Sequence, residues 1–231
     1  MLGDPELVNT MMKHNTGLSD VDAVCFTLTN ILGARYSVVK TMYEDDNSGP
    51  GVKPYPGSTV PPERRARHLQ TKTAKDHIAG LSGVKLGNQY STELQKNLRQ
   101  DGYLKQEKWD DLMDLVYDLV FPAATEVFFG KRMLELNPSL QSEVRGFLDD
   151  LPVYLRMLPR WVAPATYRRR DAALRSIKKW LLEIEERGIS TSDWNSQYGC
   201  EYVKVRHGWT RNFEEVDINS DASEILGLFM A

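Results

Sequence analysis

The segment "YRRRDAALRSIKKWLLEIEERG", residues 167–188, decides the fold class of this chain. Apolar residues recur along it at helical spacing. Those on one face are Ala173, Leu174, Ile177, Leu181 and Ile184. Glu183 and Arg187 stand four positions apart, where side chains on a helix can pair, and Gly188 supplies a helix end. The pattern predicts a long amphipathic helix with its apolar face in a core.

Helical periodicity also marks most of the remaining chain. It predicts helices over 4–15, 21–32, 62–78, 90–100 and 107–129, with Gly33 and Gly130 as helix ends. In the helix over 107–129 the expected buried face consists of Trp109, Leu112, Met113, Val116, Leu119 and Val120. Segment 79–87 is predicted to interrupt a helix, and Pro122 to kink or end one. Residues 200–218 fit a short strand or a helix, and little else favours strands, so the predicted class is mainly α.

A further helix is expected at the end of the sequence, "NSDASEILGLFMA", residues 219–231. Asp221 occupies an N-cap position and Glu224 follows three residues later, which is a capping-box pattern. The apolar run after Ala222 has neither a glycine stop nor a basic last turn. This pattern is typical of the opening of a longer helix.

The composition is ordinary for a globular protein. The 231 residues are 41% hydrophobic and 26% charged, which suits one large domain or two small ones. The net charge of -3 gives no reason to expect nucleic acid as a partner. Basic runs at Arg64, Arg65 and Arg67 and at 168–170 are interpreted as solvated helix faces. Residues 44–62, rich in Pro and Gly, are predicted to form a flexible loop.

Membrane and redox signals are sparse. No stretch approaches the ~18 apolar residues of a membrane span, and the first residues do not resemble a signal peptide. Cys25 and Cys200 have no partner spacing, which disfavours a disulfide framework or a zinc site and fits a reducing compartment. Cys25 falls on an apolar helix face and is interpreted as core. Nothing near Cys200 indicates a low-pKa thiol.

Motifs for self-sufficient catalysis are absent from the sequence. The four histidines form no helical metal-binding pair, and no nucleophile elbow, phosphate-binding loop or dinucleotide fingerprint occurs. Asp149 and Asp150 are adjacent, and adjacent residues on a helix point apart. A cap or a solvated face is therefore favoured over an acid–base pair, and neither a catalytic residue nor a metal site is predicted.

The apolar, proline-broken segment "PVYLRMLPRWVAPAT", residues 152–166, needs a different explanation. Three prolines interrupt a run that contains Tyr154, Leu155, Met157, Leu158, Trp161 and Val162. An exposed loop of this composition is unusual. We expect it to lie in the core, or to be covered by something else, such as a bilayer surface or a ligand.

The order of five segments resembles the front half of a cytochrome P-450. They are "GDPELVNTMMKH" (3–14), "DLVFPAATEVFFG" (118–130), "FLDDLPVYLRMLP" (147–159), the long helix over 167–188, and "SDASEILGLFMA" (220–231). The pattern is most similar to fungal members of the branch that contains the sterol 7α-hydroxylases and prostacyclin synthase. Each piece is a loose pattern, although together they cover nearly the whole chain.

The resemblance implies an incomplete P-450-like helical fold, with residues 1–231 as one partial domain that stops at the start of the long central helix. Residues 152–165 would form the loop between two roof helices of the substrate channel and touch the membrane surface. Tyr154, Leu158 and Trp161 would line the channel entrance. The complete family member would bind haem, accept an apolar, sterol- or terpenoid-like substrate, and use an NADPH-cytochrome reductase.

The same resemblance bears on location. Complete family members reside at the endoplasmic reticulum membrane. With no membrane span or signal peptide, this chain is expected to be cytoplasmic or membrane-peripheral.

Several family motifs are missing from this sequence. The haem-ligand loop F-x-x-G-x-R-x-C-x-G, the E-x-x-R pair and the W-x-x-x-R pattern do not occur, and the acid–Thr pair of the central helix would fall after Ala231. The thiolate ligand favours O–O cleavage in this family. We therefore expect no stably bound haem and no oxygen activation by this chain alone, and no cofactor-binding residue is assigned.

Three interpretations remain open at this point. The first is the N-terminal portion of a haem-thiolate monooxygenase, inactive by itself. The second is a non-catalytic helical protein that binds an apolar ligand or a partner. The third is an unrelated α-helical interaction domain.

Overall fold

The computed structural model describes residues 21–45, 53–100, 112–189, 194–213 and 215–230. Within these ranges the chain forms helices and turns, with no β-strand. The mainly α class is thereby confirmed. The helix expected over 4–15 and the side chain of Trp109 lie outside the described residues.

Fourteen helical segments follow one another along the described ranges. They are α2 (Val21–Phe26), η2 (Thr27–Ile31), α3 (Tyr36–Val39), η3 (Lys40–Glu44), η4 (Pro62–Arg64), α4 (Ala66–His77), α5 (Gly80–Gln100), α6 (Leu112–Phe129), α7 (Lys131–Leu136), α8 (Leu140–Asp149), α9 (Leu151–Leu155), α10 (Pro164–Glu186), α11 (Glu201–Thr210) and α12 (Ile218–Leu228). The segments η2 and η3 are π-helical continuations of α2 and α3.

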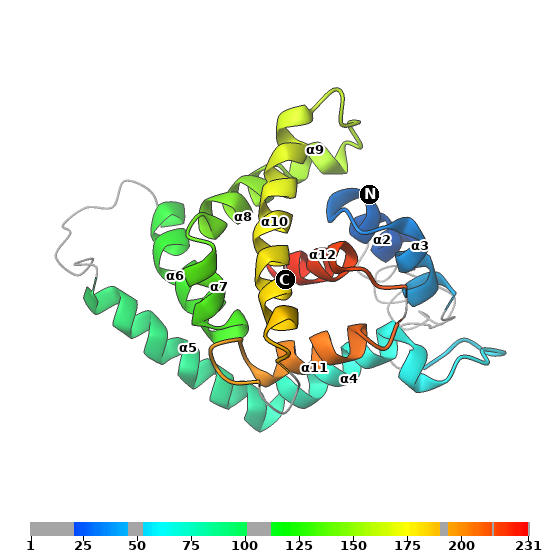
Figure 1. Ribbon diagram of the computed structural model, residues 1–231, viewed down its shortest axis with the longest axis horizontal. Helices are drawn as coiled ribbons and strands as arrows, with labels where there is room; N and C mark the ends of the chain where they lie inside the picture. The colour runs from blue at the N-terminus through cyan, green and yellow to red at the C-terminus, as the bar shows by residue number, and fades with distance from the viewer. Residues whose placement is uncertain (1–20, 46–52, 101–111, 190–193, 214, 231) are drawn as a thin grey trace, which may run out of the picture.

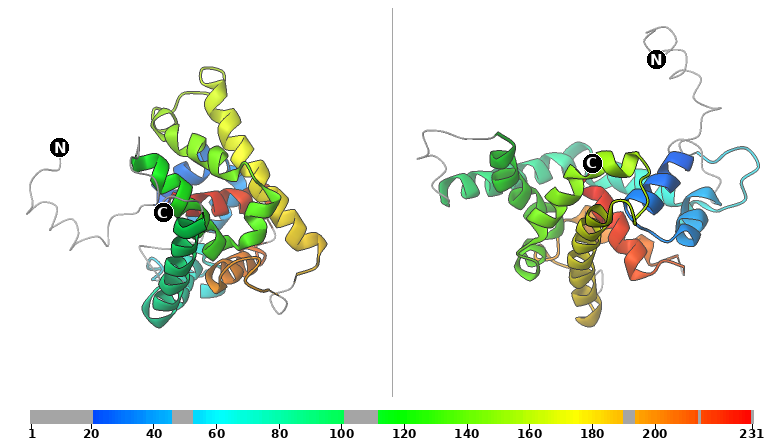
Figure 2. Two further views of the ribbon diagram at one scale, coloured as in Figure 1. Left: turned by 90° about the vertical axis from the view of Figure 1, so that its left-hand side faces the viewer. Right: turned by 90° about the horizontal axis from the view of Figure 1, so that it is seen from above.

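Helix α10 runs through the middle of the molecule, as the amphipathic pattern predicts. It packs mainly against α8 and α12. Helices α6, α7 and α8 lie on one side of it, and α2 and α3 on the other (Figure 1). Helices α4, α5 and α11 form the edge below, and the two further views show α12 enclosed among the other elements (Figure 2).

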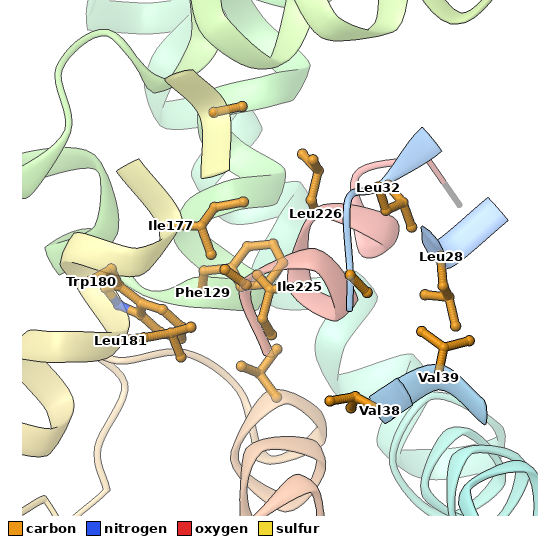
Figure 3. Packing of buried hydrophobic residues seen from close by; sticks show 14 of the residues in the cluster. Leu28, Leu32, Val38, Val39, Phe129, Ile177, Trp180, Leu181, Ile225 and Leu226 are labelled. Atoms are coloured by element: carbon orange, nitrogen blue, oxygen red, sulfur yellow. The ribbon is translucent and has the colours of Figure 1, made fainter. Parts of the chain in front are cut away.

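One continuous cluster of buried apolar residues joins these elements. Ile225 and Leu226 of α12 lie between the α10 side chains on one side and Leu28 and Leu32 on the other (Figure 3). Trp180 of α10 is fully buried, and its ring meets Phe129 edge-on at 6.2 Å between centroids. The predicted face of α10 is thus the centre of the core, with Leu174 only half-buried.

Three predicted helix ends are confirmed. Gly33, Gly130 and Gly188 have φ angles of 84°, 81° and 58°, in the left-handed region that glycine adopts most easily. Gly130 also permits a close backbone approach, because a Cβ there would lie 2.1 Å from the carbonyl oxygen of Gln197.

The predicted capping box of the last helix is wrong. Helix α12 begins at Ile218, and its N-cap is Asp217, whose carboxylate accepts a hydrogen bond from the backbone N–H of Ser220 at 2.8 Å. Asp221 and Glu224 lie inside the helix and are buried. The carboxylate of each contacts a residue distant in sequence. The two residues therefore have the spacing of a capping box but do not cap the helix.

The predicted interruption over 79–87 is also wrong. Helix α5 starts at Gly80, and the break is confined to Ile78 and Ala79. Interior glycines cost a helix only about 1 kcal/mol each, which does not end one. Helix α6 does not end at Pro122 but continues through it, and a kink at this residue stays a prediction.

The predicted buried face of α6 is correct only in part. Leu119 is buried, but Leu112, Met113 and Val116 are 70%, 53% and 38% exposed. Helices α5, α7 and α8 pack on α6, and they leave these three side chains near its start partly exposed. The periodicity correctly predicted a helix, but it could not show which turns of α6 other helices pack against.

The basic runs are not simply solvated. Arg65 and Arg170 are buried, while Arg64 and Arg168 are exposed. Long basic side chains can bury their stems and find polar partners for their heads, which a charge count does not reveal.

Two ambiguous segments also take definite form. Residues 201–210 form the helix α11, which removes the strand alternative there. Of the predicted loop 44–62, residues 53–61 are non-helical, Glu44 ends η3 and Pro62 begins η4, and 46–52 lie outside the described residues.

The core position of Trp180 makes a testable prediction. Trp180→Ala should lower the free energy of unfolding by about 3–5 kcal/mol, because a large buried side chain is replaced by a cavity. Leu182→Ala, two residues away on the exposed face, should cost less than about 1 kcal/mol. Equilibrium denaturation followed by circular dichroism measures both, and equal losses would contradict the assignment of the core face.

Candidate functional site

An exposed apolar tip joins α9 to α10. We define it as residues 155–162, which include Leu155, Met157, Trp161 and Val162, all exposed. Trp161 is 84% exposed. Pro152 and Pro164 lie in the first turns of α9 and α10, where proline is well tolerated, and Pro159 lies in the break between the two helices. The tip stands at the end of α10 far from α11 (Figure 1).

Aromatic and cationic side chains hold the tip in place. The Tyr154 hydroxyl donates to the carbonyl of Thr166 at 2.9 Å, and the Tyr167 hydroxyl donates to the carbonyl of Leu158 at 2.8 Å. Burial raises the pKa of Tyr154, so its hydroxyl stays protonated. Arg160 donates to Asp171 at 2.7 Å. The apolar side chains are therefore displayed on a fixed loop.

The guanidinium of Arg170 links this loop to the N-terminal helices. It lies over the rings of Tyr154 and Tyr167, at 5.9 and 5.1 Å from their centroids, and donates to the carbonyl of Asn30 at 3.3 Å. A Cβ on Gly33 would lie 3.1 Å from its Cζ. Glycine at position 33 thus serves both the backbone angle and the close approach of this side chain.

The three predicted channel residues take different positions. Tyr154 is buried, Leu158 is half-buried and Trp161 points into solvent. None of the three lines any of the cavities described below. Their role at a channel entrance stays a prediction.

Asp149 and Asp150 do not form an acid–base pair. Asp150 is buried at the junction of α8 and α9, and both its carboxylate oxygens accept from Arg169, at 2.6 and 2.7 Å. Asp149 is the last residue of α8. Asp149 is exposed, as expected for a solvated face, whereas Asp150 is buried in an ion pair.

A buried ionic network surrounds α12. Arg206 of α11 donates to Glu224 at 2.6 Å, and each side chain is 5% exposed. Tyr43 donates to the other oxygen of Glu224 at 2.8 Å, and Arg206 also donates to the Tyr202 hydroxyl at 3.1 Å. Three chain segments far apart in sequence are therefore joined through one carboxylate.

The surroundings raise the pKa values of Arg206 and Tyr43 in this network. Burial by itself would lower the pKa of Arg206, but the charge of Glu224 and the nearby tyrosines outweigh it and raise the pKa. Burial and Glu224 together raise the pKa of Tyr43 well above its usual value, so it remains a donor. These hydrogen bonds satisfy both terminal nitrogens of Arg206, while its buried Nε has no hydrogen-bond partner among the described residues.

A second polar contact adjoins the first. The Asp221 carboxylate lies 3.2 Å from His207 Nδ1 and 3.4 Å from Thr210 Oγ1. His207 also lies against Trp194, with ring centroids 5.9 Å apart. Neither contact is evident from the sequence. The one available signal is that four residues in the first turns of an otherwise apolar helix are polar, namely Ser220, Asp221, Ser223 and Glu224.

Three surface cavities are considered among the described residues. The largest of the three, of about 1150 Å³, lies between α5, the end of α6 and residues 194–202. A second, of about 750 Å³, is bordered by α7, α10 and the start of α12. The third, of about 460 Å³, lies beside Gly33 and Arg170. The second and third share Arg175, Lys178 and Asn219.

The thiols do not fit an axial haem ligand. Cys25 is packed in the apolar core. Burial raises the pKa of Cys200, and nearby backbone N–H groups offset this only in part, so the thiolate is disfavoured. Neither side chain is therefore suited to hold a haem iron.

Membrane-spanning helices and metal clusters are both absent from the described ranges. No helix within them has the length and hydropathy needed to cross a bilayer. Across the same residues, His, Cys, Asp and Glu side chains do not gather in threes that could bind a metal ion.

Comparison with known proteins gives two relatives. The chain is 27% identical to the cytochrome P450 monooxygenase fsoE of Humicola fuscoatra over 172 residues, which are 71% of this chain and 29% of that protein. It is 22% identical to the cytochrome P450 monooxygenase efuG of Hormonema carpetanum over 218 residues, 89% of this chain and 35% of that protein. The chain thus spans about a third of the length of the curated relatives it matches.

These similarities support a relationship to the fungal cytochrome P450 monooxygenases. They do not distinguish the sterol hydroxylase branch from others. No family model matches the chain, and no solved structure matches it.

The buried network makes a second prediction. Glu224→Gln keeps the side-chain shape but leaves Arg206 as an unpaired buried charge, so the free energy of unfolding should fall by about 3–5 kcal/mol. Asp114→Asn removes a carboxylate from a more exposed pair with Arg145 and should give no measurable change. Urea denaturation of both variants provides the comparison, and a Glu224→Gln protein as stable as the wild type would refute the role of this pair.

Proposed function

We propose that this chain is the N-terminal portion of a cytochrome P-450-type monooxygenase that hydroxylates an apolar, sterol- or terpenoid-like molecule. The similarity to two cytochrome P450 monooxygenases carries the proposal, and the mainly α fold agrees with it. The reaction class comes from the printed names of those relatives. The substrate class comes from the family resemblance of the sequence.

The α9–α10 hairpin is the part of this chain that we assign to the substrate path. Tyr154 fixes the base of the hairpin through Thr166, and Leu158 and Trp161 lie toward its outer end. An apolar molecule arriving from a lipid surface could pass over such a loop without losing apolar contact. We therefore keep these three residues as the proposed channel entrance.

The tip is also the proposed contact with the membrane surface. Its exposed apolar side chains are flanked by Arg156 and Arg160, which are exposed as well. Aromatic and aliphatic side chains can enter the interface while arginines stay near anionic headgroups. A peripheral contact of this kind needs no membrane-spanning helix. We place the complete protein at the endoplasmic reticulum membrane, with an NADPH-cytochrome reductase as its electron donor.

Haem chemistry is not assigned to this chain. In complete family members a thiolate-ligated haem supplies oxygen activation. Neither Cys25 nor Cys200 fits that ligand, so we propose that the chain is inactive on its own.

A non-catalytic helical binding protein is the second candidate function. One observation favours it: Leu112 and Val116, one turn apart at the start of α6, are apolar side chains that are 70% and 38% exposed. Such a surface suits a partner.

The transcript separates the two candidates. If the monooxygenase proposal is correct, the reading frame after the Ala231 codon should encode an acid–Thr pair, then E-x-x-R, then the Cys loop. A reading frame that lacks all three would overturn it in favour of the binding protein. As a second readout, a reduced carbon monoxide spectrum of this chain mixed with haem should lack a thiolate-type Soret band, and observing that band would refute its proposed inactivity.

The membrane contact is tested with matched leucines. Leu155→Ser in the tip should weaken binding to vesicles of phosphatidylcholine with phosphatidylserine by about tenfold, because one leucine contributes about 1.5–3 kcal/mol when buried. Leu81→Ser is the control, since Leu81 is 90% exposed on α5, away from the tip. Vesicle co-sedimentation measures both. Equal binding by the two variants would remove the tip from the proposed membrane contact.

A further inference from the structure

The 750 Å³ cavity combines a cationic rim with aliphatic walls. Five basic side chains border it, Arg132, Arg175, Lys178, Lys179 and Arg187, against two carboxylates, Glu183 and Glu186. This local excess of positive charge occurs on a chain whose net charge is -3. Leu136, Leu182 and Ile218 supply the apolar part of the lining.

Some of these cations are already neutralised. Arg132 donates to both oxygens of Glu183, at 2.7 and 3.2 Å, and Arg187 lies 2.9 Å from the same carboxylate. These contacts hold the wall near the end of α10 together. They also leave Glu183 no strong attraction for a further cation.

The other three cations form a ridge on α10, which we define as Arg175, Lys178 and Lys179. In the described part of the chain, no carboxylate lies within ion-pair distance of any of them. Lys178 donates to the side-chain oxygen of Asn219 at 2.9 Å, and Lys179 to the carbonyl of Leu136 at 2.7 Å. Both ammonium groups are therefore positioned by neutral acceptors, and their charge is not balanced.

Repulsion among the three cations of this ridge lowers the stability of the folded chain, and a bound anion would offset that repulsion. Cations three and four positions apart on one helix face repel one another. Arg175 and Lys178 also border the adjoining 460 Å³ cavity, where Asp171 and Asp217 line the wall, so an anion would approach them from the 750 Å³ side. Arginine presents a planar fork of donors that matches a carboxylate in two parallel hydrogen bonds.

The aliphatic residues narrow the class of ligand. Leu182 is 44% exposed and lies on α10 one turn beyond Lys178, and Leu136 and Ile218 face the same cavity. A small inorganic anion would leave these groups unused. A phosphate dianion would meet more repulsion from Glu186 than a carboxylate would. The combination fits a singly charged head with a short hydrocarbon tail.

We infer that this cavity binds a single-chain amphiphile with a carboxylate head, its head held by Arg175 and Lys178 and its tail against Leu182. This site is separate from the tip and does not depend on the monooxygenase proposal. It uses residues that neither the ionic network around Glu224 nor the tip employs.

The test uses decanoate as the probe and the full chain as the protein. Isothermal titration calorimetry at constant ionic strength should show saturable binding of one decanoate. Inorganic phosphate, with a head but no tail, and 1-decanol, with a tail but no charge, should each bind at least about tenfold more weakly. Arg175→Gln and Lys178→Gln should each weaken decanoate binding by about tenfold, because each removes a charge-assisted hydrogen bond.

Matched controls make the result specific. Arg168→Gln changes the same charge on the same helix at an exposed position outside both cavities, and it should leave the affinity unchanged. Leu182→Ser should weaken decanoate binding and leave that of phosphate as it was. Circular dichroism checks that each variant is folded.

Four outcomes would overturn the inference, and three of them concern the cavity itself. They are no saturable binding, an equal loss in Arg168→Gln and Arg175→Gln, and decanol binding as tightly as decanoate. A loss caused by Leu155→Ser in place of Arg175→Gln would move the binding to the tip, and would equally refute this site.

Discussion

The constraint on which the arrangement depends is the burial of polar side chains in α12. Residues Ser220 to Leu226 are all buried, and four of them are polar. Burying an ionised or hydroxyl group without partners is costly, so the surrounding elements must supply them. Arg206 and Tyr43 do so for Glu224, and His207 and Thr210 for Asp221. The positions of α11 and η3 beside α12 are therefore fixed by electrostatics as well as by apolar packing.

Patterns among neighbouring residues predicted much of the fold. They failed where contacts with residues distant in sequence determine the role or exposure of a side chain. The periodicity of α10 and the glycine ends at 33, 130 and 188 depend on neighbouring residues alone, and the structure confirms them. Asp221 and Glu224 have the spacing of a capping box, but their carboxylates accept hydrogen bonds from Thr210 and Arg206 of α11. The exposure of Leu112 depends on which helices cover α6, and no local pattern contains that information.

The candidate site shows the same division. The proline-broken segment 152–166 was marked by composition, and part of it does lie exposed at the surface. The anchors Tyr154 and Arg170 were not foreseen, since their roles arise from contacts with Thr166, Asn30 and Gly33. Arg170 looked like one member of a solvated basic run. Its burial under two tyrosine rings became evident only from the three-dimensional arrangement.

Gly33 couples the N-terminal helices to a loop that is distant from it in sequence. Any side chain at this position would meet the guanidinium of Arg170, which also stacks on the two tyrosines that support the α9–α10 hairpin. Positions 33, 154, 167 and 170 are thus physically coupled despite their separation along the sequence. A side chain at position 33 would have a strained backbone angle and would require the guanidinium of Arg170 to move by a few tenths of an ångström, so the N-terminal helices constrain a loop more than a hundred residues downstream.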